Sequence, residues 1–372
     1  MSEKDSRHPF RISRRRFLEG LGALSAAAVV GTGCSKDDNG PSGPSNDDPA
    51  GPTSAQVALG DVSMYDHNVL KNKLIDMFDK IGGLGDIIKS GDKVGMKVNL
   101  TGGNWAANKW QRDTGVSAGE SFWTHPQVAN VVGELCKDAG AGQLYIVESI
   151  YDWKSMSEPG FTQVAGQLNA EIFDTNKTDP STNYTKRAVG SHAMIYQNIY
   201  QNSLFAEFDC FISLPKAKQH VSAGVTHAMK NLVGTLPQPL YSQDGSGNRA
   251  EIHNHDDKYD GNKNNNLCRV ILDINSATKI HLSVIDAIKT TVGGEGPWCK
   301  TMANMEFNKL IVSKDPVAAD SIATQVIGFN PNADDYTDTF ALPGTPCINY
   351  LRKAEEIGLG VNDLSKIKVF DV

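Results

Sequence analysis

The sequence predicts an α/β fold: a mostly parallel sheet flanked by helices, forming a single large domain with long loop insertions. Two observations lead to this expectation. The segment 93–148 reads as strand–helix–strand with short turns that contain glycine, which is the pattern of a βαβ unit. Further along the chain, apolar runs that read as buried strands are interspersed with segments that read as helices. We expect the domain to span residues 56–372.

The first part of the domain contains the predicted βαβ unit. The expected elements are, in order, a helix over 67–81, a buried strand over 93–100, a long polar loop over 101–122, a helix over 126–139 and a strand over 144–148. The bounds of the second helix follow from local signals. Thr124 or His125 can cap it, Pro126 suits its first turn, and Gly140 ends it.

The second part of the domain continues the mixture of strands and helices. The expected elements are a helix over 160–168, strands over 171–174 and 208–215, a helix over 222–234, a polar loop over 237–267, a helix over 268–278, strands over 282–287 and 310–313, helices over 316–328 and 347–357, and a strand over 368–370. Asp315 followed by Pro316 marks the start of one of these helices, with the aspartate as its cap.

Residues 1–34 predict a twin-arginine export signal. The motif Ser13-Arg14-Arg15-Arg16-Phe17-Leu18-Glu19 precedes an apolar run over 21–30 and a small-residue end at Cys34. The run is far shorter than the roughly 20 residues that a membrane-spanning helix needs. We therefore expect the twin-arginine export machinery as a partner, and a periplasmic or cell-surface location.

Cys34 stands where a lipoprotein cysteine would stand. The segment 35–55 is rich in Asp, Asn, Gly, Pro and Ser and predicts a disordered linker. Together these features favour a signal of the lipoprotein type, with a lipid anchor at Cys34 as the only contact with a membrane. The alternative is plain cleavage near this position, because Gly31-Thr32-Gly33 lacks the leucine usual three residues before such a cysteine.

Charge and cysteine usage exclude several classes of protein. The formal charge is −7, and residues 1–33 carry six basic and three acidic side chains, so the chain without them carries −10. An acidic chain argues against nucleic-acid binding, which requires a basic face. The five remaining cysteines are widely spaced and form no Cys-x-x-Cys pair, so we expect neither an iron–sulfur cluster nor a structural zinc site.

The densest group of chemically capable side chains follows the predicted strand 208–215. Its members are Lys216, Lys218, His220, His227, Lys230 and Asn231. Ligands of parallel sheets bind beyond the carboxyl ends of strands, and lysines and helix amino termini both favour anions. We therefore expect a small anionic ligand; the alternative is a set of solvated surface lysines. A histidine and a buried lysine can form an acid–base pair, so His220 and Lys230 are the predicted catalytic residues, whereas His227 reads as structural.

Other candidates lie at the ends of neighbouring strands. Lys97, Asn99 and Glu148 are predicted to bind the ligand together with Lys216, Lys218 and Asn231. His253 and His255 alternate in a polar loop, so they could chelate a transition metal with His220 as a further ligand; two exposed histidines are the alternative. The cofactor itself is not identified by any motif, because the common nucleotide, serine-hydrolase and zincin signatures are absent.

Several segments together resemble one family, catalogued as domain of unknown function 362. They are Val94 to Leu100, Thr124-His125-Pro126, Val147-Glu148-Ser149, Leu214 to Gly234, Gly293 to Pro297 and Ser313 to Asp320. This resemblance implies no established reaction. A fainter resemblance, to nickel-pincer lactate racemases, rests on the order of His220, Gly224, Lys230 and then His253 or His255. In that family a glycine pair precedes the lysine, where this chain has His227-Ala228-Met229.

The sequence as a whole favours an exported α/β enzyme that acts on a small anionic substrate with His/Lys acid–base chemistry. The competing interpretation is a non-catalytic periplasmic lipoprotein that binds an anion or a metal with the same side chains. Turnover of a bound ligand separates the two.

Overall fold

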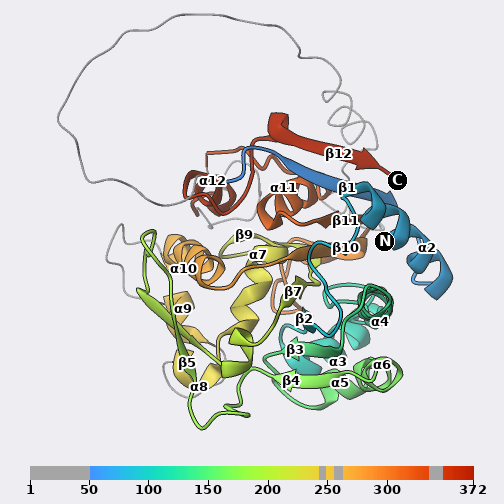
Figure 1. The fold of residues 1–372 in the computed structure, drawn as a ribbon, viewed down its shortest axis with the longest axis horizontal. Helices are drawn as coiled ribbons and strands as arrows, with labels where there is room; N and C mark the ends of the chain where they lie inside the picture. Colours follow the sequence, from blue (N-terminus) through green and yellow to red (C-terminus); the bar gives the residue numbers. More distant parts are fainter. Residues whose placement is uncertain (1–50, 243–248, 255–262, 335–346) are drawn as a thin grey trace, which may run out of the picture. The chain divides into compact units, whose positions relative to one another are not determined.

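The computed structural model describes residues 51–242, 249–254, 263–334 and 347–372 (Figure 1). The predicted export signal, Cys34, most of the predicted linker and His255 lie outside these residues, so the predictions made for them stay predictions. Within the described part of the chain, no helix combines the length and apolar character needed to cross a membrane.

The main sheet confirms the predicted α/β class. Its central strands are β2 (Lys93–Lys97), β3 (Gln143–Glu148), β4 (Glu171–Asp174), β7 (Cys210–Ser213) and β10 (Leu282–Val292). These strands pair in parallel in the order β4-β3-β2-β7-β10. Beyond β10, the strand β11 (Ala303–Ser313) pairs antiparallel with both β10 and β1 (Ala55–Asp61), and β12 (Ile367–Asp371) adds in parallel to β1. The sheet is therefore mostly parallel, with a mixed edge.

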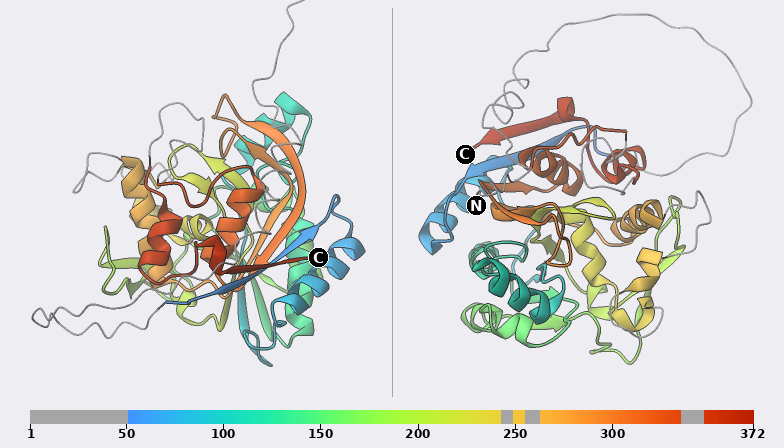
Figure 2. Two further views of the ribbon diagram at one scale, coloured as in Figure 1. Left: turned by 90° about the horizontal axis from the view of Figure 1, so that it is seen from above. Right: turned by 180° about the vertical axis from the view of Figure 1, so that it is seen from behind.

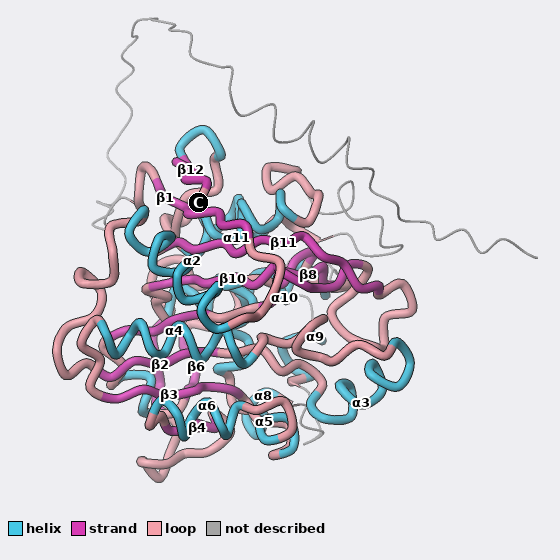
Figure 3. The backbone as a smooth tube through the Cα atoms, turned by 90° about the vertical axis from the view of Figure 1, so that its right-hand side faces the viewer, coloured by secondary structure: helices cyan, strands magenta, loops and turns pink. Residues whose placement is uncertain are grey.

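Helices cover both faces of this sheet (Figures 2 and 3). One face packs against α2 (His67–Lys80), α4 (Pro126–Asp138) and α6 (Phe161–Leu168), and the other against α7 (Ala228–Asn231), α10 (Lys263–Ala277), α11 (Pro316–Val326) and α12 (Tyr350–Glu356). Strand side chains alternate between these layers, so Val94 and Met96 enter the first core while Lys97 faces the other side. Gly133 lets α4 approach α6 closely, because a Cβ there would lie 2.3 Å from Leu168 Cδ1.

Most predicted elements are present within three residues of their expected bounds, whereas β10, β11 and α10 are each at least five residues longer at one end than predicted. The polar stretch 101–122 is not a continuous loop. It contains the helix α3 (Gly103–Thr114). Gly102 and Gly115 adopt positive φ at its two ends, and Ala106 and Trp110, four residues apart, are buried. The prediction of a loop was wrong because the polar composition of the segment concealed this narrow apolar stripe.

The predicted helix over 222–234 was also wrong in its first half. Strand β8 (Lys216–His220) turns back as β9 (Gly224–Thr226), with His220 opposite Gly224. Gly224 has φ of +75°, which suits glycine and interrupts a helix. Only after this hairpin do α7 and the short helix η3 (Leu232–Thr235) begin.

Smaller elements complete the fold and correct the remaining expectations. The predicted loop over 237–267 contains α8 (Gln238–Tyr241), α9 (Ala250–Asn254) and the first turn of α10, which begins at Lys263. Elements without a sequence prediction are β1, α5 (Lys154–Ser157), the hairpin of β5 (Thr185–Ala188) and β6 (Asn198–Gln201), η2 (Ser203–Ala206) and η4 (Leu364–Lys366).

Candidate functional site

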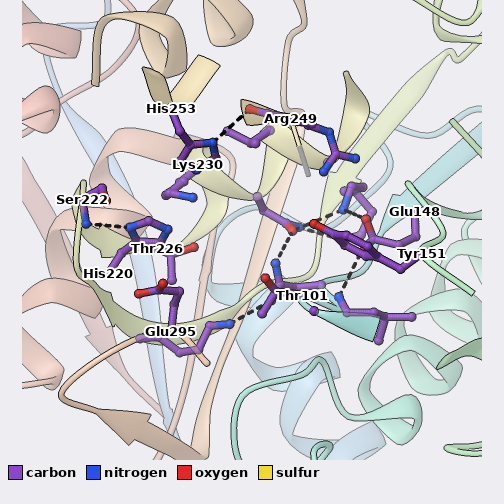
Figure 4. Close-up of a pocket in the computed structure, with 18 of the residues that line it drawn as sticks. Thr101, Glu148, Tyr151, His220, Ser222, Thr226, Lys230, Arg249, His253 and Glu295 are labelled. Carbon is purple, nitrogen blue, oxygen red and sulfur yellow. Dashed lines mark hydrogen bonds and ion pairs between the residues drawn. The ribbon is translucent and has the colours of Figure 1, made fainter. Parts of the chain in front are cut away.

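A cavity of about 430 Å³ lies where β2 and β3 end and the β8–β9 hairpin turns back (Figure 4). Its polar and charged lining residues include Lys97, Asn99, Thr101, Glu148, Lys218, His220, Ser222, Thr226, Lys230, Asn231, Arg249, His253 and Glu295. Tyr151 and Trp298 line it too and are 43% and 44% exposed, so they lie toward the solvent. The structure thus brings together eight of the side chains that the sequence singled out, from segments far apart in the chain.

Lys97 and Glu148 form a buried ion pair in the wall of the cavity. The Lys97 Nζ atom lies 2.8 Å from Glu148 Oε1, and the two carboxylate oxygens also accept hydrogen bonds from the N–H groups of Leu100 and Ser149. Burial lowers the pKa of Lys97, and the carboxylate of Glu148 opposes this shift. Gly234 lies against the pair: a Cβ there would be 2.6 Å from Lys97 Nζ. The charges of Lys97 and Glu148 therefore satisfy each other before any ligand binds.

A chain of hydrogen bonds connects this pair to Lys218. Lys218 Nζ donates to Asn99 Oδ1 at 2.9 Å and to the carbonyl oxygen of Phe122 at 2.7 Å. Asn99 donates to Asn231 Oδ1 at 3.3 Å, and Asn231 in turn donates to the carbonyl oxygen of Lys97 at 2.9 Å. Burial lowers the pKa of Lys218 to about 7. Lys218 is consequently held in place, with a pKa suited to proton transfer near neutral pH.

Lys230 differs from the other two lysines of the cavity. It is buried, yet its amine forms no hydrogen bond or ion pair with any residue of the described ranges. Burial lowers its pKa to about 8, partly opposed by the carboxylate of Glu295. The helix α7, which carries Lys230, is held in position because the buried side chain of Asp320 on α11 accepts hydrogen bonds from the N–H groups of Ala228 and Met229, at 2.7 and 3.0 Å.

His220 and His253 face each other with ring centroids 6.5 Å apart. The N–H of Ser222 donates to His220 Nδ1 at 3.1 Å, so the neutral ring of His220 carries its proton on Nε2. His253 Nδ1 lies 3.2 Å from the carbonyl oxygen of Arg249, which leaves Nε2 as the acceptor of that ring. Burial lowers the pKa of His220 well below its usual range and that of His253 to about 4. Both imidazoles are therefore neutral at pH 7.

Two charged residues of the cavity were missed by the sequence analysis. Arg249 precedes α9; its Nε donates to the carbonyl oxygen of Leu236 at 2.7 Å, while its buried Nη2 has no hydrogen-bond partner among the described residues. Glu295 accepts hydrogen bonds from the N–H of Val221 at 3.0 Å and from Trp298 Nε1 at 2.6 Å. Glu295 belongs to a glycine-rich segment that the sequence did mark, whereas no pattern distinguished Arg249 within its polar stretch.

Lys216, which was predicted to bind the ligand, does not line the cavity. Its Nζ lies 2.6 Å from Asp286 and donates to Tyr65 Oη and to the carbonyl oxygen of Gly119, both at 2.8 Å. Lys216 and Asp286 are both fully buried. The lysine thus belongs to a buried structural ion pair. His227 likewise lies outside the cavity lining and is fully buried, as a structural residue would be.

The predicted metal site has only two of its three ligands in the described part of the chain. His220 and His253 both line the cavity, and His255 lies outside the described residues. Among the residues that are described, no three His, Cys, Asp or Glu side chains are grouped so that they could hold a metal ion. A metal at this site stays a prediction.

Three comparisons relate the chain to known proteins. It is 24% identical over 278 residues to the thylakoid-associated protein sll1697 of Synechocystis sp., an alignment that covers 74% of this chain and 75% of that protein. A crystal structure of a Thermotoga maritima protein aligns with 11% identity and a TM-score of 0.37, over 70% of this chain and 58% of the other. That similarity is too low to carry an argument.

The family comparison covers most of the cavity. Residues 112–325 match the family described as Domain of unknown function (DUF362). This range contains Glu148, Lys218, His220, Lys230 and Arg249, and the resemblance predicted from the sequence segments is confirmed. The resemblance to nickel-pincer lactate racemases stays a prediction. Because this match covers more than half of the chain, the chain belongs to the DUF362 family.

Proposed function

We propose that this protein is an enzyme that binds a small anionic substrate in the cavity and transfers a proton to or from it. The observation that carries the proposal is a pair of cationic groups in the cavity wall that have no partner among the described residues: Lys230 Nζ, which opens into the cavity, and Arg249 Nη2, which is buried. A buried charge such as that of Arg249 is unfavourable by several kcal/mol when it has no partner. A carboxylate or phosphate placed between these groups would supply the missing partner.

The remaining side chains suit proton transfer. Lys218, with a pKa of about 7, is close to half neutral at pH 7 and can accept a proton. His220 presents Nε2–H from a neutral ring, which can donate a hydrogen bond to a developing negative charge without being a cation itself. Lys97 and Glu148 are already paired, so their role is to hold the wall of the cavity in shape.

We also propose that the protein acts outside the cytoplasm, on the basis of the signal predicted over 1–34 and the cysteine at position 34. The description of the Synechocystis relative as thylakoid-associated supports an association with a membrane. Fractionation of cells that express the wild type or the double variant R14K/R15K tests this proposal. Wild-type protein in the exported fraction and variant retained in the cytoplasm is the expected result; equal distribution of the two contradicts it.

A binding screen tests the function itself. Thermal shift and calorimetry with small carboxylates and phosphate esters should identify at least one anion that binds the wild type. Binding should weaken by about 10- to 100-fold in R249M, because a charge-assisted hydrogen bond contributes about 1.5–3 kcal/mol. The matched control is R112M, since the Arg112 side chain is 70% exposed and, within the part of the chain that the structure describes, pairs with Asp113 alone. Equal affinities of the wild type and R249M would place the anion elsewhere.

Turnover separates the enzyme from a non-catalytic binding protein. Proton exchange at carbon atoms of the bound anion can be followed by NMR in D₂O. Exchange in the wild type that is lost in K218M supports catalysis. Binding without exchange or any other chemical change would favour a non-catalytic anion-binding protein instead.

A further inference from the structure

The three lysines that line the cavity within the described residues differ in what their amines already bind. Lys97 is paired with Glu148, and Lys218 donates to Asn99 and to a backbone carbonyl oxygen. Lys230 binds nothing in the described part of the chain and opens into the cavity. Only Lys230 can therefore change its bonding without a loss of existing contacts.

This difference matters for covalent chemistry at nitrogen. An amine that becomes an imine keeps at most one N–H. At Lys218 the change would leave Asn99 Oδ1 or the Phe122 carbonyl oxygen without its donor, which is unfavourable for a polar group shielded from water. At Lys97 it would weaken a buried ion pair, which is more expensive still. At Lys230 no contact of this kind is lost.

We propose that Lys230 forms an imine with the carbonyl carbon of a small oxo acid whose carboxylate is bound by Arg249. The inference rests on the function proposed above and names the substrate class of the same site. Arg249 Nη2 provides a donor for a carboxylate, and the cavity volume of about 430 Å³ is sufficient for an oxo acid of several carbon atoms.

The reaction needs no oxidant or reductant. The neutral amine of Lys230 attacks the carbonyl carbon, a C–N bond forms, the C=O π bond breaks, and the oxygen takes a proton from solvent. The nitrogen gives up a proton to Lys218, the nearby base with a pKa near 7. Lys218 returns this proton to the hydroxyl group as the C–O bond breaks, water leaves, and a protonated imine remains. His220 Nε2–H is the hydrogen-bond donor available to the oxygen as it gains charge.

Reductive trapping tests this proposal on the full-length protein. The probes are glyoxylate, pyruvate and 2-oxoglutarate, each with sodium cyanoborohydride, which reduces a protonated imine to a stable secondary amine. For at least one probe, intact mass should increase by the mass of the oxo acid minus one oxygen atom, with one adduct per chain. Peptide mapping should place that adduct on Lys230, with K230M not labelled.

The labelled residue distinguishes this proposal from the alternative that the lysine with the lowest pKa reacts first. If a low pKa alone decided, Lys218 would be labelled first, because its pKa of about 7 is below that of Lys230 at about 8. Labelling of Lys218, of Lys97 or of exposed lysines in place of Lys230 overturns the proposal. Since the mapping is done on wild-type protein, this result does not depend on whether K230M folds.

Hydroxy acids separate a failure of this inference from a failure of the proposed function. Glycolate, lactate and 2-hydroxyglutarate carry the same charge as the three probes but cannot form an imine. If they bind with dependence on Arg249 while no oxo acid is trapped, the imine is wrong and the anion site stands. If neither series binds and nothing is trapped, the imine proposal fails together with the assignment of small carboxylates to this cavity.

Discussion

Replacing Lys230 by methionine should stabilise the fold near neutral pH. Burial lowers the pKa of Lys230 from its ordinary value of 10.5 to about 8, so the unfolded chain binds this proton more tightly than the folded one. At about 1.36 kcal/mol per pKa unit, the shift destabilises the wild type by about 3 kcal/mol at pH 7. Methionine is similar in volume, carries no proton and avoids this cost.

The sign of the pH dependence follows from the same shift. Because the folded-state pKa is below the unfolded-state pKa, the cost is fully present below about pH 8 and disappears as the pH rises toward 10.5. At pH 10 the remaining cost is about 1 kcal/mol. The stability advantage of K230M over the wild type should therefore shrink by about 2 kcal/mol between pH 7 and pH 10.

Urea denaturation at these two pH values, in buffers without phosphate or sulfate, measures the effect. K137M is the matched control, because Lys137 is exposed at the end of α4 and its replacement should change stability little at either pH. An advantage of K230M that is the same at pH 7 and pH 10 would refute the reasoning. Such a result would mean that the amine of Lys230 is not desolvated in the folded protein.

Three further substitutions test buried polar contacts, two of which support the cavity and one of which lies outside it. D320A removes the acceptor of the Ala228 and Met229 N–H groups, so it should lower stability by about 1–3 kcal/mol and weaken anion binding. Its control is D363A at an exposed helix cap, which should lower stability only slightly and leave anion binding unchanged. K216A leaves Asp286 buried without its partner, so it should lower stability by about 3–5 kcal/mol while anion affinity stays unchanged. Its control is K314A, which breaks a surface pair with Asp86 and should lower stability by less than about 1 kcal/mol. G234A places a Cβ 2.6 Å from Lys97 Nζ and should cost about 1–3 kcal/mol through displacement of the Lys97–Glu148 pair; a crystal structure of G234A with this pair intact would contradict that account.

The sequence was sufficient to find much of the site because of a property of parallel sheets. Lys97 and Glu148 are the last residues of two neighbouring parallel strands, and Asn99 follows the first of them, so their meeting at one edge could be expected from the order of elements. Lys218, His220 and Lys230 were found through their density in one segment. His253 was predicted as a candidate because its imidazole lies in a polar stretch.

What the sequence could not provide was the path of the chain after β7. A helix over 222–234 would have placed His220 and Lys230 quite differently from the observed hairpin, whose turn depends on Gly224 and on pairing with the distant strand β10. Lys216 and Lys218 have the same local pattern, and only the positions of Asp286 and Asn99 decide that the first is structural and the second lines the cavity. Such contacts join residues far apart in the chain and leave no local signal.

The hydrogen bonds from α7 to Asp320 have a consequence for synthesis of the protein. One wall of the cavity comes from Lys97 and Glu148, while the helix that carries Lys230 is fixed by a carboxylate more than 170 residues later in the chain than Glu148. A nascent chain on the ribosome can therefore form β2 and β3 early, but it cannot complete the cavity until α11 has emerged. Capture of a ligand by this site thus follows almost complete translation of the domain.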